Sequence, residues 1–288
     1  MKDWNHNEIA CLQSKGGVTV TTHPYHNLIR SGCEPWPPPE IVQKLYKSSQ
    51  IRAFSEEDKA ICMSGLGFYC DLQSIHSEDA ITWSVFGTVA HAPQPELESW
   101  LGDLMDLLDL SDVDTTGADI FLWRRIPHPD TLVQGGPEID VGISTCNALI
   151  LGEAKWRSGV GAAQGKNKDK DQIQLRGEFL RNYASKFYSS CSEFVVLGIS
   201  LFEGAFEDTT PEDVTFRCAT WEQICSLQSH PQAEELGRYF AWKKDCTQAK
   251  PGTVTKGGRR ESFAGLRPTR VPTPQTLIPF KPLKPSNP

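Results

Sequence analysis

The sequence predicts a mixed α/β layer fold with a hairpin at the centre of its sheet. Between residues 77 and 221 the segments alternate in the order helix, three strands, helix, strand. The strand-like segments are apolar enough to be buried. The hairpin, EIDVGISTCNALILGEAKW at residues 138 to 156, supplies two of these strands. Helices that cover a sheet on its faces are the layer arrangement that buries such segments.

Each element has its own local signal. Ser77 is a helix N-cap, which predicts a helix over residues 77–90, and Pro95 opens a second helix over 95–110. A strand is expected at 120–126, before the hairpin. The periodicity of the later segments predicts a helix at 169–188, strands at 193–202 and 214–221, and closing helices at 220–228 and 231–245.

The chain divides into three parts. Residues 1–70 form an irregular N-terminal extension, in which the prolines at 37–39 lead into a short helix. Residues 71–246 form the α/β domain. Residues 247–288 hold eight Lys and Arg against one acid, and repeated prolines predict an extended tail. The tail is either simply solvated or an arm that contacts phosphates or a partner, with Ile278 and Phe280 as anchors.

Composition excludes several classes of protein. No apolar run is long enough for a membrane span, and the first residues lack a signal-peptide pattern, so we expect a cytoplasmic protein without a membrane partner. Nine irregularly spaced cysteines with no CxxC pair argue against a disulfide framework. The net charge of −7 does not exclude a nucleic-acid partner, because a local basic surface is sufficient for binding.

The hairpin carries charges among apolar residues. Asn tolerates positive φ, which favours a tight turn at Cys146–Asn147. With this turn, the numbers of any two residues that face each other across the hairpin add up to 293. Asp140 then lies directly across from Glu153. Lys155 shares a face with Glu153, because residues two apart in a strand point the same way.

Two opposed carboxylates repel each other unless a proton or a cation lies between them. A hard cation such as Mg²⁺ suits Asp140 and Glu153, and the carbonyl oxygen of Ala154 is a further ligand. Lys155 offsets one negative charge and orients or helps to deprotonate a metal-bound water. The residues alone leave open an edge hairpin whose charges face water and form a weak ion pair.

Asp140, followed after a dozen residues by Glu153-x-Lys155 at the end of an apolar strand, resembles the motif of the PD-(D/E)xK nuclease superfamily. The resemblance implies a restriction-endonuclease-like αβββαβ core with a central mixed sheet flanked by helices. It also implies Mg²⁺-dependent hydrolysis of phosphodiester bonds, with Mn²⁺ as a substitute. DNA is the expected substrate, and bacterial or phage defence, restriction or repair the expected role. In the family motif the acid directly follows the proline, whereas here Glu138 and Ile139 stand between Pro137 and Asp140. Glu138 is therefore a rival ligand.

Two further residues take roles from the same resemblance. The family often carries a glutamine on the helix after the motif, which assigns a site-shaping role to Gln172; the alternative is a residue that starts the helix. A helix-borne acid completes the metal shell in the family, which assigns Glu78 as a ligand and Asp79 as a weaker candidate. The alternative for Glu78 is an acid in the first helical turn, favoured by the helix dipole.

Basic residues supply the expected contacts to nucleic acid. Arg157, Lys166 and Lys168 belong to a glycine-rich loop next to the hairpin, which either tracks a phosphate backbone or is solvated. Arg176 lies on the inner face of its helix and contacts phosphate or forms an ion pair. A protein partner or a homodimer is also compatible with the sequence. Two alternatives stay open: a non-catalytic binding module with the same fold, and another hydrolase whose hairpin charges lie on the surface.

Overall fold

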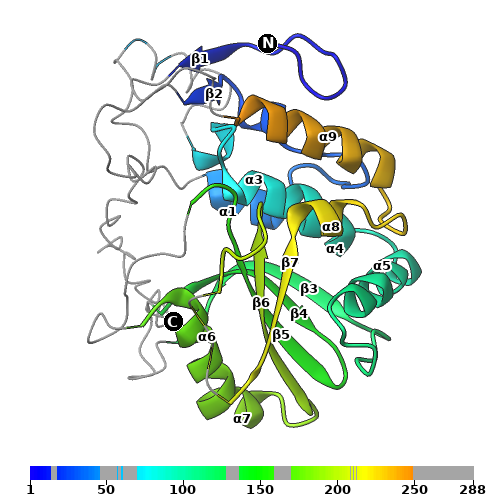
Figure 1. Ribbon diagram of the computed structural model, residues 1–288. Coiled ribbons are helices and arrows are strands. Elements are labelled where there is room, and N and C mark those ends of the chain that lie inside the picture. Colours follow the sequence, from blue (N-terminus) through cyan, green and yellow to red (C-terminus); the bar gives the residue numbers. More distant parts are fainter. Residues whose placement is uncertain are drawn as a thin grey trace, which may run out of the picture.

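A five-stranded mixed sheet forms the centre of the molecule (Figure 1). The computed structural model describes residues 1–13, 18–45, 57, 60, 70–127, 136–158, 170–207, 209, 211 and 213–248. The strands lie in the order β3 (Asp119–Arg125), β4 (Glu138–Ser144), β5 (Ala148–Ala154), β6 (Glu193–Ser200) and β7 (Thr215–Thr220). The first three strands are antiparallel, and β5, β6 and β7 are parallel. The expectation of a mixed sheet with the hairpin at its centre is confirmed.

Helices cover both faces of this sheet. One face carries α3 (Glu78–Thr82), the π-helical turn η4 (Trp83–Gly87), α4 (Thr88–Ala90), α5 (Gln94–Leu107) and α8 (Trp221–Cys225). Helix α9 (Ala233–Cys246) lies beyond α3 and α8, next to the N-terminal segments (Figure 1). The other face carries α6 (Gln172–Phe179), the π-helical turn η5 (Leu180–Ala184) and α7 (Ser185–Phe187). Along β5, Ala148 and Ile150 belong to the first core, whereas Leu149 and Leu151 belong to the second. Alternate side chains of this one strand therefore pack into the two cores on opposite faces of the sheet.

Capping residues start the helices near the predicted positions. The hydroxyl of Ser77 accepts a hydrogen bond from the amide of Ala80 at 3.1 Å, as an N-cap should. Asp171 caps α6, because its carboxylate accepts from the amide of Gln174 at 2.9 Å. Phe187, at the end of the helical segment that α6 begins, has a side chain that is 68% exposed. None of the residues of α7 is buried, so the apolar surface ends before this last turn.

The hairpin has the predicted register. Val141 pairs with Gly152 and Ser144 with Leu149, so opposed numbers add up to 293. The predicted reason for the turn is wrong, because Asn147 does not have a positive φ. Its side chain instead accepts from the amide of Asp114 and donates to the carbonyl of Asp112, both at 3.0 Å. The hydroxyl of Thr145 also accepts from the amides of Asn147 at 3.3 Å and Ala148 at 2.9 Å, so both local and tertiary hydrogen bonds hold the turn.

The alternative of an edge hairpin whose charges face water is also wrong. Strand β5 lies in the middle of the sheet, and all seven of its residues are buried. The hydrolase alternative with surface charges on the hairpin depends on the same arrangement. The parallel strand β6 covers the edge of β5 that a lone hairpin would expose, so the surface arrangement that both alternatives assume is absent.

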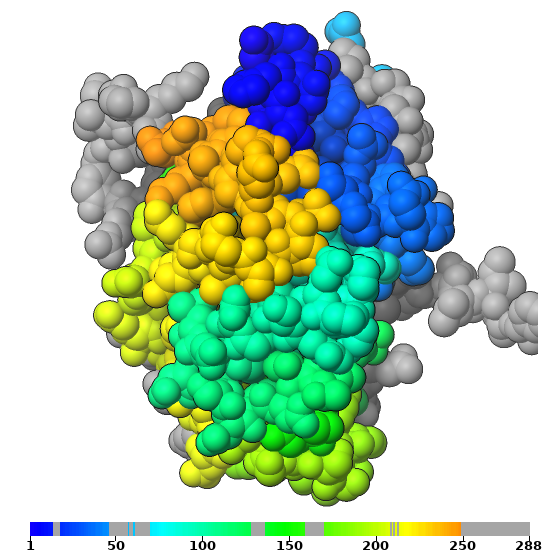
Figure 2. Space-filling model, turned by 90° about the vertical axis from the view of Figure 1, so that its right-hand side faces the viewer, coloured from blue at the N-terminus to red at the C-terminus, as the bar shows by residue number. Residues whose placement is uncertain are grey.

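The N-terminal segments pack against the helical layer. They include β1 (Cys11–Gln13), β2 (Thr19–Thr21), the 3-10 turns η1 (Pro24–Asn27) and η3 (Asp71–Gln73), and α1 (Pro39–Leu45), which begins at the predicted prolines. The indole of Trp4 donates to Glu235 of α9 at 2.9 Å and contacts Tyr239 edge-on. Figure 2 shows the N-terminal segments and α9 as one continuous surface.

Two further expectations concern other parts of the chain. Residues 249–288, which include Ile278 and Phe280 of the predicted tail, lie outside the described residues. In the part of the chain that the structure describes, no helix is long and apolar enough to cross a membrane.

Candidate active site

Asp140 stands where the β4–β5 ladder ends. The last recorded pair is Val141 and Gly152, so Asp140 and Glu153 occupy the next opposed positions. The carboxylate of Asp140 accepts a hydrogen bond from the amide of Ala154 at 2.8 Å, in the place of a backbone partner. The carbonyl of a strand residue points to the same side as its amide, so the carbonyl of Ala154 points toward β4. The three residues that were predicted to supply oxygen ligands, Asp140, Glu153 and Ala154, line one pocket.

Glu153 is fully buried and binds two cations. One carboxylate oxygen forms an ion pair with the ammonium group of Lys155, and the other forms an ion pair with the guanidinium group of Arg176. Burial lowers the pKa of Lys155, but the carboxylates of Glu153, Glu78 and Asp140 more than offset this, so its pKa lies above the ordinary value. Lys155 therefore stays protonated at neutral pH and cannot serve as a base there.

Arg176 ties helix α6 to the hairpin. Its guanidinium group donates to the carbonyls of Glu138 at 2.7 Å and Gln172 at 3.0 Å, and lies 4.0 Å from the carboxylate of Asp140. The side chain is completely buried. A guanidinium group in this position does not reach a phosphate in solution. Of the two predicted roles, the ion pair is the one that the structure shows.

Glu78 joins this group from the first turn of α3. Its carboxylate accepts from the amide of Trp156 at 2.8 Å and from the hydroxyl of Ser158 at 2.9 Å. Burial raises the pKa of Glu78. The pKa of Asp140 is raised further, by burial and then by the negative charge of Glu153. Among the described residues, neither acid has a cation within hydrogen-bonding distance. Both sites therefore favour a proton or an added cation.

These residues line a pocket of about 260 Å³. Of the predicted residues, it contains Glu78, Asp79, Asp140, Glu153, Ala154, Lys155, Arg157 and Gln172. Gln172 is half-buried and is the first residue of α6, so its position fits both the predicted site-shaping role and the alternative of a residue that starts the helix. The remaining lining residues were not predicted as site residues: Val18, Asp71, Ser74, His76, Ser77 and Ser158.

His76 is the most notable of the missed residues. Burial lowers its pKa to about 4, with smaller contributions from Lys243 and Arg157, so the imidazole is neutral at pH 7. His76 immediately precedes the predicted N-cap Ser77. That position on the chain was a signal that it would lie near Glu78.

The rival ligands Glu138 and Asp79 have a different partner. Their carboxylates lie 2.7 Å and 2.8 Å from the ammonium group of Lys44. Lys44 belongs to α1, so the N-terminal extension contributes directly to the surroundings of the site.

The donor set suits a hard divalent cation in part. Within the described residues, no group of three or more His, Cys, Asp and Glu side chains is arranged to hold a metal ion. Asp140 and Glu78 nevertheless offer carboxylate oxygens with raised pKa values beside the carbonyl of Ala154, which is the ligand chemistry that Mg²⁺ prefers. Glu153 is already neutralised, so it binds a metal only by releasing Lys155 or Arg176.

The predicted basic loop is only partly described. Arg157 lines the pocket, and its guanidinium group donates to the hydroxyl of Thr247 at 3.1 Å and lies 5.8 Å from the ring centroid of Phe202. Lys166 and Lys168 lie outside the described residues. Contacts of this loop with nucleic acid stay a prediction.

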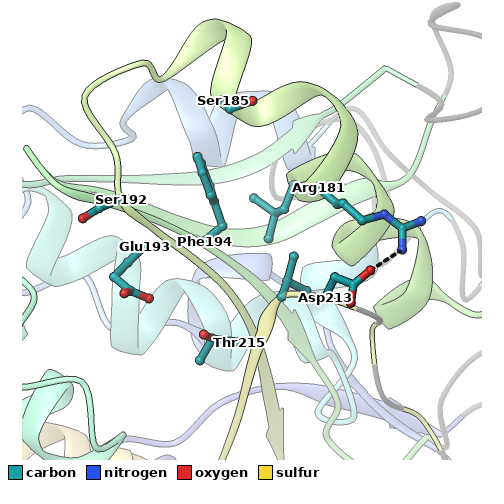
Figure 3. A pocket seen from close by; sticks show the side chains of 9 residues that line it. Arg181, Ser185, Ser192, Glu193, Phe194, Asp213 and Thr215 are labelled. Atoms are coloured by element: carbon teal, nitrogen blue, oxygen red, sulfur yellow. Dashed lines mark ion pairs between the residues drawn. The ribbon is translucent and has the colours of Figure 1, made fainter.

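A second hollow of about 560 Å³ lies at the opposite end of the sheet (Figure 3). Its lining includes Glu193 and Phe194 at the start of β6 and Thr215 at the start of β7. Arg181 and Asp213 face each other there at 3.6 Å, and the Asp213 side chain is 81% exposed. Solvated charges of this kind interact weakly, so this hollow lacks the chemistry of the first.

Comparisons with known proteins give no relative for this chain. No protein-family model, no curated protein and no solved structure matches it. The resemblance to the PD-(D/E)xK superfamily therefore depends on the motif in the hairpin and on the order of the elements around it.

Proposed function

We propose that this chain is a metal-dependent nuclease of the PD-(D/E)xK type that hydrolyses phosphodiester bonds in DNA. One observation carries the proposal: Asp140 and Glu153 stand at opposed positions where a buried central strand ends, Lys155 follows two residues after Glu153, and all three line one pocket. Charged groups in such a place are costly to bury, which favours a functional reason for keeping them.

Each residue has a role in this reaction. Asp140 and Glu78 hold the divalent cation through carboxylates that are protonated or unpaired without it. A bound cation supplies charge neutralisation and a lowered pKa for a coordinated water. Lys155, which stays protonated, stabilises negative charge that develops on the phosphate. Gln172 shapes the wall of the pocket, and Glu153 holds Lys155 in place.

A non-catalytic binding module with the same sheet is the second candidate. It is favoured by the ion pairs of Glu153, because both carboxylate oxygens already have protein cations. A closed charge network of this kind can stabilise a fold without performing chemistry. In that case Asp140 contributes to local structure through its bond to Ala154 and binds no metal.

Cleavage of supercoiled, linear and single-stranded DNA in Mg²⁺, Mn²⁺ or EDTA separates the two candidates. The nuclease requires cleavage by the wild type in metal and its loss in Asp140→Asn. The matched control is Asp213→Asn, an exposed acid far along the sheet, which should cut like the wild type. A wild type that shifts DNA in a gel but never cuts it, with Asp140→Asn binding equally well, supports the binding module.

A further inference from the structure

Lys44 is a buried cation in the midst of the acids that surround the site. It lies on α1 and is only 5% exposed. Its ammonium group is 2.8 Å from a carboxylate oxygen of Asp79, 2.7 Å from one of Glu138 and 4.7 Å from the ring centroid of Trp123. Burial lowers the pKa of Lys44, but the two carboxylates raise it beyond the ordinary value. Lys44 therefore stays charged and has three separate contacts.

The two partners of Lys44 are sequence neighbours of the proposed cation ligands. Asp79 follows Glu78 in the first turn of α3. Glu138 precedes Asp140 by two residues on β4. Each element therefore offers two acids, and Lys44 binds one from each. Asp79 also lines the site pocket, so its carboxylate is close enough to compete for a cation there.

We propose that Lys44 is a positioning residue that withholds Asp79 and Glu138 from the cation site. It leaves Glu78 and Asp140 as the acids available to a divalent cation. The part of this inference that concerns the cation rests on the proposed function. Lys44 also joins α3 to β4 through its two ion pairs, which fixes the elements that carry Glu78 and Asp140.

Removing this charge has a specific chemical consequence. Asp79 and Glu138 both contact this ammonium group, and Glu138 also lies 3.6 Å from the guanidinium group of Arg125, which is 57% exposed and therefore screened by solvent. Loss of the buried ammonium group leaves both acids with less positive charge around them, and the two carboxylates repel each other. Such a pair attracts a proton or a divalent cation in place of the lysine. A purely structural lysine would not produce a new cation site when it is replaced.

The experiment compares Lys44→Met with a triple variant that also carries Asp79→Asn and Glu138→Gln. The exposed ion pair of Lys244 with Glu222 provides the control Lys244→Met. Two quantities are measured besides DNA cleavage: the number of Mn²⁺ ions bound per chain, by electron paramagnetic resonance of free Mn²⁺, and the urea midpoint of unfolding in EDTA.

We expect Lys44→Met to bind one more Mn²⁺ than the wild type, to unfold at lower urea and to cut DNA at least about tenfold more slowly. The triple variant should return to the wild-type Mn²⁺ count and recover most of the midpoint and of the cleavage rate. Lys244→Met should match the wild type throughout.

Equal Mn²⁺ counts for Lys44→Met and the wild type overturn the inference, as does a triple variant as destabilised as Lys44→Met. If Lys44→Met does not fold, the triple variant decides: a folded protein with the wild-type count supports the inference, and an unfolded one overturns it. A wild type that binds no Mn²⁺ refutes the proposed function, whereas an added ion in Lys44→Met still supports the role of Lys44.

Discussion

The guanidinium group of Arg176 forms an ion pair with the carboxylate of Glu153, and both side chains are fully buried. The pair joins helix α6 to the central strand, and of the two cations bound to Glu153 it is Lys155 that lines the pocket. Arg176 itself does not line the pocket. We therefore expect the two cations that bind Glu153 to have different roles. Arg176 should contribute to the free energy of unfolding, and Lys155 should contribute to the rate of DNA cleavage.

Replacing Arg176 with Met should lower the free energy of unfolding by about 3 kcal/mol, because it removes one partner of a buried ion pair. Urea denaturation followed by circular dichroism measures the change. The control is Arg181→Met on the same helical segment, whose ion pair with Asp213 is exposed and should be worth less than about 1 kcal/mol. Equal losses in the two variants would mean that the buried pair contributes nothing special.

Replacing Lys155 with Met should abolish DNA cleavage while the protein stays folded. Glu153 retains Arg176, and the methionine keeps most of the packing of the lysine stem. Loss of a charge that stabilises a transition state typically reduces the rate at least about 100-fold. Single-turnover cleavage measures this effect, with the exposed Lys186→Met as the control. A folded Lys155→Met protein that cuts at the wild-type rate would contradict the assignment.

Cation binding should strengthen as the pH rises. Burial and neighbouring charge raise the pKa of Asp140 and burial raises that of Glu78, so a cation must displace protons at low pH. The Mn²⁺ affinity should then increase by up to about tenfold per pH unit for each proton displaced, and level off once both acids are ionised. Calorimetric titrations between about pH 5 and about pH 8 test this. An affinity that does not change over this range refutes the prediction.

Acid should destabilise the protein through His230. Its imidazole is buried, donates to the carbonyl of Val85 at 2.9 Å and accepts from the amide of Gln232 at 3.0 Å, which fixes the neutral form. Burial lowers its pKa to about 4 from an ordinary 6.5. Between these values only the unfolded state binds the proton, so stability is complete above the ordinary pKa and is lost as the pH falls toward the folded pKa.

The total loss due to His230 is about 3 kcal/mol. Urea unfolding at a series of pH values should show a smaller loss across this range in His230→Gln than in the wild type, although the variant is less stable at neutral pH. His91→Gln, at an exposed histidine, should keep the wild-type slope. Identical slopes in all three proteins would remove His230 as the cause.

Much of the fold could be predicted because its signals are local. Ser77 and Asp171 cap their helices with hydrogen bonds to residues three positions ahead. The apolar run of β5 predicts a buried strand, and the turn at Cys146–Asn147 sets the register that opposes Asp140 to Glu153. Such relations depend on neighbours within a few residues, which a sequence displays directly.

The sequence alone therefore determined the main elements of the α/β domain, the register of the hairpin and the candidate residues Asp140, Glu153 and Lys155, but not the short strands β1 and β2 of the N-terminal extension. Only the tertiary structure decided how their charges are balanced. Lys44 binds an acid 94 residues away, and Arg176 turns inward to Glu153 although its position on the helix was equally compatible with a phosphate contact. Buried ion pairs form where the packing of the elements brings opposite charges together away from water. The periodicity of the sequence does not predict which charges those are.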